Sequence, residues 1–301
     1  MTETAQKAST SQWLIAIGSI TALLLVSVAI AYAGGDQGVR LGSLSVFAWC
    51  GVFAYGVQWI VFIHAWQTLS EKFFDLTGSL TYVVMAVAAV IMSAAYDLRA
   101  ITLLVLISIW ALRLGPFLYF RIKQAGEDKR FRSIRIYFPT FFMTWTIQGT
   151  WVYLTSCAAL AAITSGRVVP VDAFFLGGLA LWMLGFGIEV IADRQKTAFR
   201  ANPENANRFI TTGLWAWSRH PNYFGEIMLW AGIAVMAIPV LEGWQLFTLI
   251  SPIWVLFLLT AISGVRMLEN RAARQWGEDP EYQSYKARTP VLVMLPPKKG
   301  G

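Results

Sequence analysis

The sequence has few of the residues on which metal, disulfide and thiol chemistry depend. Its 301 residues include two cysteines and two histidines, and only 14% of them are charged. Cys50 and Cys157 lie inside apolar runs with no Cys-x-x-Cys pair, which excludes a disulfide framework. Because His64 and His220 are the only imidazoles and no His-Glu-x-x-His sequence occurs, we expect no zinc site.

A dinucleotide-binding glycine motif is also missing. Gly185-Phe186-Gly187 lacks both a third glycine and a preceding strand, so it is not a Rossmann fingerprint. We interpret these glycines as positions of close helix packing. The net charge of +7 would suit nucleic acid, but the basic residues lie on the connections between apolar runs, and no nucleic-acid partner is expected.

Apolar residues, in contrast, are abundant. They make up 56% of the chain, 14 of them are tryptophan, and the mean hydropathy is +0.55. This composition predicts an all-α, polytopic membrane helical bundle that forms a single membrane domain over residues 1–301. Tryptophans near the ends of apolar runs suit the headgroup level of a bilayer.

Eight apolar segments are long enough, or nearly so, to cross a core of about 30 Å. Ala29-x-Ala31-x-Ala33 resembles a signal-peptidase site, but the run before it is too long for a signal peptide, so we expect a retained helix. Residues 1–43 would form this extra helix and its loop. The expected spans are 13–33, 44–66, 79–95, 99–120, 136–163, 171–193, 222–241 and 244–264.

The basic residues predict the orientation of these spans. With the N-terminus inside, 20 of the 24 Lys and Arg residues fall on one side of the membrane. Arg40, Arg99 and Arg167 fall on the other side, and Arg113 lies within a segment. Because cytoplasmic loops are rich in Lys and Arg, both termini are expected to be cytoplasmic.

Several ionisable residues lie at the cytoplasmic ends of the apolar segments. Glu189 and Asp193 are spaced i, i+4 and share a helix face, as do Asn222 and Glu226. Arg113 lies roughly 12 Å deep, where it either snorkels to the interface or has a functional partner. The group is either a structural salt-bridge network or a cleft for an anion or cofactor.

Arginines follow these acids along the chain. Arg200, Arg208 and Arg219 suit phosphate, because a guanidinium pairs with it through two parallel hydrogen bonds. Each of them alone is explained by membrane topology. Together with the acids and the amide, they favour a cleft for a phosphorylated, nucleotide-type cofactor.

Three stretches resemble a known group of membrane enzymes. They are FDLTGSLTYV at 74–83, ALRLGPFLYFRIKQAGEDKRF at 111–131, and EVIADRQKTAFRANPENANRFITTGLWAWSRHPNYFGEIMLW at 189–230. They are similar to the C-terminal domain of steroid 5α-reductases and, more closely, to the bacterial membrane proteins called DUF1295. The resemblance covers residues 70–295, which would form a reductase-like core.

The resemblance implies a seven-helix core, with the first helix added to it, and NADPH held between the helix bundle and the cytoplasmic loops. Hydride would add to a carbon–carbon double bond conjugated to a carbonyl. Glu189 stands where the steroid enzymes have Asn, and Asn270 where they have His. The implied cofactor-binding residues are Arg113, Glu189, Asp193, Arg200, Arg208, Asn222, Glu226 and Asn270.

The catalytic acid departs from the steroid enzymes. Trp110 occupies the position of their catalytic tyrosine, and their glutamate falls close to Asp75. Asp75 is therefore our candidate acid, with Tyr82, seven residues on, as its partner. The alternative for Asp75 is a helix N-cap.

We thus predict an NADPH-dependent membrane reductase of a lipophilic enone, such as a 3-oxo-steroid, a sterol or an isoprenoid, in a bacterial inner membrane. Its substrate would enter from the bilayer, so membrane lipids are its expected surroundings. Two alternatives stay open. Arg-His-Pro-x-Tyr also resembles isoprenylcysteine carboxyl methyltransferases, which use S-adenosylmethionine, and Glu269, Trp276-Gly277 and Tyr282 fit their pattern. A transporter or scaffold is the third reading, but the outer halves of the helices carry no acid or base to line a path.

Overall fold

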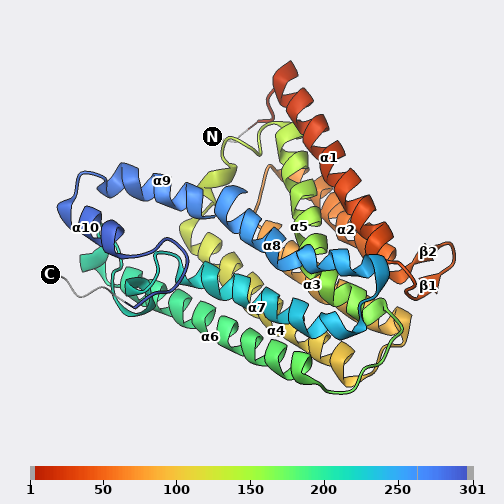
Figure 1. Ribbon diagram of the computed structural model, residues 1–301. Helices are drawn as coiled ribbons and strands as arrows, with labels where there is room; N and C mark the ends of the chain where they lie inside the picture. Colours follow the sequence, from red (N-terminus) through yellow and green to blue (C-terminus); the bar gives the residue numbers. More distant parts are fainter. Residues whose placement is uncertain (1–3, 263, 297–301) are drawn as a thin grey trace. The chain divides into compact units, whose positions relative to one another are not determined.

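The computed structural model describes residues 4–262 and 264–296, and Figure 1 shows their course. Within these residues the chain is helical apart from one short hairpin, in which β1 (Arg40–Leu41) pairs antiparallel with β2 (Leu44–Ser45). Gly42, in the tight turn between the strands, has a φ of +66°, a conformation that glycine adopts without steric cost. The predicted all-α fold class is confirmed.

The chain divides into two compact units, a subdivision that the sequence did not indicate. The first combines Met1–Asp172 with Ala237–Ile250, and the second combines Ala173–Met236 with Ser251–Gly301. The first unit contains α1 (Thr10–Gly34), α2 (Val46–Thr68), α3 (Phe74–Ser93), α4 (Leu98–Ala125) and α5 (Phe138–Thr164), with the short helices η1 (Lys129–Phe131), η4 (Ile238–Val240) and η5 (Gly243–Ile250).

Helix α5 is the central element of the first unit. It packs against α1, α2 and α3, and nearly all of its residues from Trp145 to Thr164 are buried. Its polar side chains bond within the unit: the Tyr55 hydroxyl lies 2.8 Å from Thr150 Oγ1 and 2.6 Å from Ser27 Oγ. Neighbouring helices, rather than lipid, therefore surround the Thr, Ser and Gln residues of α5.

The second unit contains the elements that carry most of the predicted site. Helix α6 begins immediately after Asp172, and the loop at 202–220 leads to α7, which opens with Pro221, a residue that suits the first turn of a helix. The elements are α6 (Ala173–Ala201), η2 (Pro203–Asn205), η3 (Gly213–Ala216), α7 (Pro221–Ala237), α8 (Ser251–Phe257), the π-helical turn η6 (Leu258–Ile262), α9 (Val265–Trp276) and α10 (Pro280–Arg288).

Seven helical segments of the described chain are long and apolar enough to cross a membrane. The protein is therefore an integral membrane protein with a polytopic helical fold. The number is one below the expected eight, and α5, which covers the expected span 136–163, is not among them. The seven are Thr10–Gly34, Val46–Thr68, Phe74–Ser93, Leu98–Gln124, Ala173–Ala201, Pro221–Val240 and Gly243–Trp276.

Helices α6 and α7 run side by side in the second unit and touch through their backbones (Figure 1). A Cβ on Gly185 would lie 2.6 Å from the Gly225 oxygen and 2.6 Å from the Leu229 nitrogen. Seven residues along each helix, a Cβ on Gly178 would lie 2.6 Å from the Gly232 oxygen. Gly185 therefore serves the close helix packing that the sequence predicts, whereas Gly187 faces open space.

These two glycines give a matched test of that contact. We expect Gly185→Ala to lower the free energy of unfolding by about 1–3 kcal/mol, because the added methyl group would overlap the backbone of α7. Gly187→Ala, two residues along the same helix, should be neutral or slightly stabilising, because alanine favours helix more than glycine does. Thermal unfolding of the two purified variants in the same detergent measures both effects, and equal melting temperatures would contradict the contact.

Candidate active site

The predicted polar residues of α6 and α7 face one another. Asn222 Nδ2 donates to Asp193 Oδ1 over 3.3 Å, and a Cβ on Gly225 would lie 2.7 Å from the Glu189 nitrogen. The side chains of Glu189, Asp193 and Glu226 are all buried. The structure thus brings Glu189, Asp193 and Asn222 together where the two helices touch, and Glu226 is buried one turn further along α7.

The loop at 202–220 is anchored to the C-terminal half of α6. Trp215 Nε1 donates to the Ala192 carbonyl over 3.1 Å, and the Leu214 amide donates to Gln195 Oε1 over 2.9 Å. Trp215 packs with Ala192 and Ile210 in a small apolar cluster. This anchoring lays the basic loop against the helix that carries Asp193.

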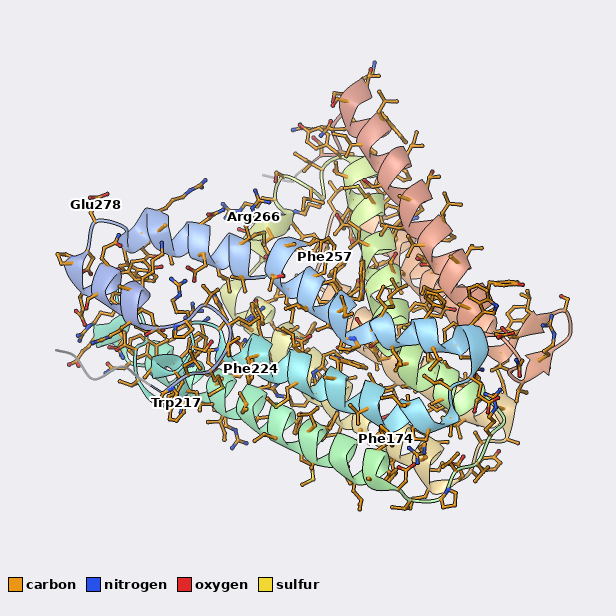
Figure 2. The ribbon with its side chains drawn as sticks, in the orientation of Figure 1. Phe174, Trp217, Phe224, Phe257, Arg266 and Glu278 are labelled. Atoms are coloured by element: carbon orange, nitrogen blue, oxygen red, sulfur yellow. The ribbon has the colours of Figure 1, made fainter. Side chains whose placement is uncertain are left out.

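The C-terminal helices cover the same loop from another direction. The Tyr285 hydroxyl of α10 donates to the Trp215 carbonyl over 2.7 Å, and Trp276 Nε1 of α9 donates to the Asn207 carbonyl over 2.8 Å. Beyond α10, the Leu295 amide donates to the carbonyl of Trp217, a residue labelled in Figure 2. The loop is therefore enclosed by α6, α9, α10 and the segment after α10.

A pocket of about 150 Å³ lies among these elements. Its cationic residues outnumber its single carboxylate, that of Glu269, and six aromatic rings share the lining with them. Lys196 Nζ lies 4.5 Å from the centre of the Trp215 ring, a cation–π contact. The residues that line the pocket are Lys196, Phe199, Arg200, Arg208, Phe209, Ile210, Trp215, Arg219, His220, Leu268, Glu269, Arg271, Ala272, Gln275, Trp276, Tyr282 and Tyr285.

One carboxylate connects α9 to the segment that precedes α7. Glu269 Oε2 lies 2.9 Å from Arg219 Nη1, and Glu269 Oε1 lies 2.9 Å from His220 Nε2. Because a carboxylate accepts, His220 carries its proton on Nε2. Burial lowers the pKa of His220, although the hydrogen bond that the imidazole donates to Glu269 opposes that shift. The imidazole is therefore neutral at physiological pH.

Helix α6 carries its charges in a graded order along one face. Glu189, Asp193, Lys196 and Arg200 are separated by four, three and four residues, and α6 continues to Ala201. The two acids lie beside α7, and the two bases line the pocket. The helix rises about 16 Å over the eleven steps from Glu189 to Arg200.

The structure places the remaining predicted cofactor residues in different positions. Arg200 and Arg208 line the pocket, as expected for a phosphate site. Asn270 is exposed on α9, and its neighbours Glu269 and Arg271 line the pocket instead. Arg113 belongs to the first unit, where its guanidinium carbon lies 5.5 Å from the centre of the Phe117 ring.

The predicted catalytic residues also belong to the first unit. Asp75 is the second residue of α3, whose N-cap is Phe73, so the capping alternative for Asp75 is wrong. An acid in the first turn still interacts favourably with the helix dipole. The Tyr82 side chain is buried edge-on against Trp110, with ring centroids 5.2 Å apart. Tyr82 thus lies beside the position where the steroid enzymes have their tyrosine.

The sequence reasoning missed several residues of the pocket. Lys196 follows Asp193 by three residues, and helical spacing alone was enough to find it. No local sequence pattern predicts the positions of Trp215 and Tyr285, because these positions depend on contacts between segments that are distant in the chain.

The sequence profile of the family described as "Protein of unknown function (DUF1295)" matches residues 59–289, most of the chain. The chain belongs to this family. It is 25% identical over 171 residues to "Uncharacterized protein C594.04c" of Schizosaccharomyces pombe, covering 46% of this chain and 49% of that protein. No solved structure matches it.

Shorter similarities connect the chain to steroid reductases, as the resemblance predicted. "3-oxo-5-alpha-steroid 4-dehydrogenase 1" of Bos taurus is 33% identical over 73 residues, covering 24% of this chain and 28% of that protein. "Steroid 5-alpha-reductase DET2" of Gossypium hirsutum is 37% identical over 62 residues, covering 21% of this chain and 24% of that protein. The chain thus spans half or less of the length of these curated relatives.

The pocket predicts a pH dependence of stability. Because burial lowers the pKa of His220 below its usual 6.5, the unfolded chain takes up a proton more readily than the folded one. The free energy of unfolding should therefore fall as the pH drops below about 6.5. Above that pH the neutral His220 makes its full contribution to stability. Melting temperatures between about pH 5 and about pH 8 measure this loss.

In His220→Gln, which keeps an N–H donor near Glu269, this part of the pH dependence should be missing. His64 is the other histidine and is exposed, so His64→Gln should behave as the wild type does. Superimposable pH profiles of the wild type and His220→Gln would contradict the assignment.

Proposed function

We propose that this protein is an NADPH-dependent membrane reductase that reduces the conjugated double bond of a lipophilic enone, such as a 3-oxo-steroid, a sterol or an isoprenoid-like compound. The basic, aromatic pocket next to the polar contact of α6 and α7 carries this proposal. The partial similarity to proteins named as steroid reductases supports it.

The residues present fit a phosphorylated dinucleotide. Arginine forks suit phosphate oxygens, and the flat aromatic faces of the pocket suit an adenine ring. At about 150 Å³ the pocket is small for a whole dinucleotide, since ligand pockets commonly reach 300–1,000 Å³. Its size suits the phosphoadenosine end of the cofactor. The polar residues of α6 and α7, which are Glu189, Asp193, Asn222 and Glu226, would bind the nicotinamide end.

The basic residues of the pocket and the polar residues of α6 and α7 would then bind different parts of the cofactor. Arg200 and Arg208 would bind phosphate groups, which their charge and donor geometry favour. Asn222 and Glu226 would orient the nicotinamide end, and Glu189 and Asp193 would bond its amide or hydroxyl groups. This division follows the acid-to-base order of α6.

NADPH, when bound, supplies the hydride that adds to the β-carbon of the enone. Asp75 is the proposed acid, which would hydrogen-bond the carbonyl oxygen as negative charge develops there. Tyr82 would assist it, since its ring is held against Trp110. Arg113 would be a further contact of the cofactor.

The candidate membrane spans support the proposed setting of the reaction. An apolar substrate would enter from the bilayer, and a water-soluble cofactor would approach from the side that carries most of the basic residues. We place the protein in a bacterial inner membrane with both termini cytoplasmic.

A methyltransferase is the second candidate, and one observation favours it. Glu269, Trp276 and Tyr282, which fit the pattern of isoprenylcysteine methyltransferases, line one pocket. That pocket also holds five cationic side chains, which S-adenosylmethionine, with no phosphate, does not need. The reductase therefore remains the better explanation.

The cofactor assignment has a direct test in Arg200→Ala. We expect the purified wild type to bind NADPH, and the variant to bind it about tenfold more weakly, a loss near 1.4 kcal/mol. If Arg200 binds the 2′-phosphate, which NADH lacks, the affinity for NADH should change less than the affinity for NADPH. Fluorescence titration measures both affinities, because Trp215 and Trp276 line the pocket.

Arg194→Ala is the matched control, because Arg194 is exposed on α6 and does not line the pocket. Equal losses for NADPH and NADH would remove the 2′-phosphate from the assignment of Arg200. Binding of S-adenosylmethionine without binding of NADPH would replace the reductase with the methyltransferase.

The acid has its own test in Asp75→Asn. We expect turnover of an enone such as a 3-oxo-4-ene steroid to fall about 100-fold, the usual size of a general-acid contribution. Affinity for NADPH should stay unchanged, because Asp75 has no proposed contact with the cofactor. NADPH oxidation at saturating cofactor measures turnover, and an unchanged rate would remove Asp75 from the mechanism.

A further inference from the structure

Arg219 differs from the other arginines of the pocket in its burial. Its side chain is only 9% exposed, whereas Arg200, Arg208 and Arg271 are exposed. Its backbone amide donates to the Pro290 carbonyl over 2.9 Å, which fixes the segment that carries it. A buried guanidinium needs partners for its donors, because an unpaired buried charge is costly.

The guanidinium of Arg219 is only partly satisfied by the protein. Nη1 lies 2.9 Å from the Glu269 carboxylate as an ion pair, without hydrogen-bond geometry, and the buried Nε likewise has no hydrogen-bond partner among the described residues. Because Arg219 lines the pocket, a ligand there is a natural partner for this donor. Buried donors without partners are uncommon in folded proteins.

Glu269 holds this arginine through a two-sided contact. One carboxylate oxygen contacts Arg219, and the other contacts His220. The His220 ring is stacked on Tyr223, with ring centroids 5.7 Å apart. Tyr223 in turn faces Gly264, where an added Cβ would lie 3.0 Å from the tyrosine ring. The orientation of the guanidinium thus depends on the docking of α9.

We propose that Arg219 is a phosphate-binding residue of the pocket, which donates from Nε to an anionic oxygen of the ligand, and that Glu269 is its positioning residue. The ligand class is a phosphate-bearing adenosine, and this inference rests on the proposed function. It separates two kinds of arginine: Arg219 is held in place before the ligand arrives, and Arg200 and Arg208 act from the exposed rim.

Because Arg219 is buried, its contribution to ligand affinity should depend less on ionic strength than that of an exposed arginine. Raising the ionic strength from about 0.1 M to about 1 M shortens the Debye length from about 10 Å to about 3 Å, which weakens exposed charges more than buried ones. The contribution of Arg208 to affinity should therefore shrink at high salt. The contribution of Arg219 should persist.

The experiment uses the full-length purified protein and adenosine 2′,5′-bisphosphate as the probe. Arg219→Lys keeps the charge and its ability to pair with Glu269, but it removes the Nε donor. We expect the variant to keep its melting temperature within a few degrees and to bind the probe about 10- to 100-fold more weakly at both salt concentrations. Arg208→Gln should lose affinity mainly at low salt.

Two further variants complete the design. Arg266 is exposed on α9 and does not line the pocket, so Arg266→Gln is the matched control and should bind as the wild type does (Figure 2). Glu269→Gln should weaken binding of the probe in the same direction as Arg219→Lys. The double variant should then lose less than the two single losses combined, because both act through one guanidinium.

The outcomes separate this inference from the function on which it rests. If Arg219→Lys is folded and binds the probe as tightly as the wild type, Arg219 has only a structural role and the inference fails, while the reductase proposal stands. A loss in Arg219→Lys that disappears at high salt also overturns it. If the wild type itself binds neither the probe nor NADPH, the proposed function fails.

Discussion

The backbone contact between α6 and α7 is the constraint on which the candidate site depends. Four glycines, two on each helix and seven residues apart, let the two backbones approach closely at two points. The helices therefore come close enough for Asn222 of one to reach Asp193 of the other. Without this approach the acids would face lipid or other helices singly, where an isolated charge is costly.

The polar residues at the contact of α6 and α7 and the basic residues of the pocket follow one another along α6. Acids and an amide lie where the helix meets α7, and lysine and arginine follow where it meets the loop and the C-terminal helices. A ligand that is neutral and hydrogen-bonding at one end and anionic at the other would match this order. The dinucleotide of the proposed function has that polarity, which is why the cofactor is supported better than the substrate.

How far the sequence predicted the site depended on the range of the contacts involved. Helical spacing is local, so the pairs Glu189 with Asp193 and Asn222 with Glu226 were found from their positions alone. Asn270 was assigned by resemblance, but the register of α9 turns Glu269 and Arg271 toward the pocket in its place. The bridge from Glu269 to Arg219 joins residues far apart in the chain, which periodicity cannot predict.

The membrane spans show the same limit. Most were placed within a few residues, because length and hydropathy are local properties. Helix α5 was expected as a further span, and its helical extent was predicted correctly. Its polar side chains are explained only by the helices that surround it, and which helices those are depends on the whole of the first unit.

The pocket combines segments that lie far apart in the sequence, from α6 to α10. Arg219 leaves the ribosome before Glu269, and at about 5–20 residues per second the interval is roughly 3–10 s. During that time the arginine has neither its carboxylate partner nor the cover of α9 and α10. A newly synthesised chain therefore exposes Arg219 before Glu269 exists to pair with it, so the pocket cannot form until α9 has followed α7.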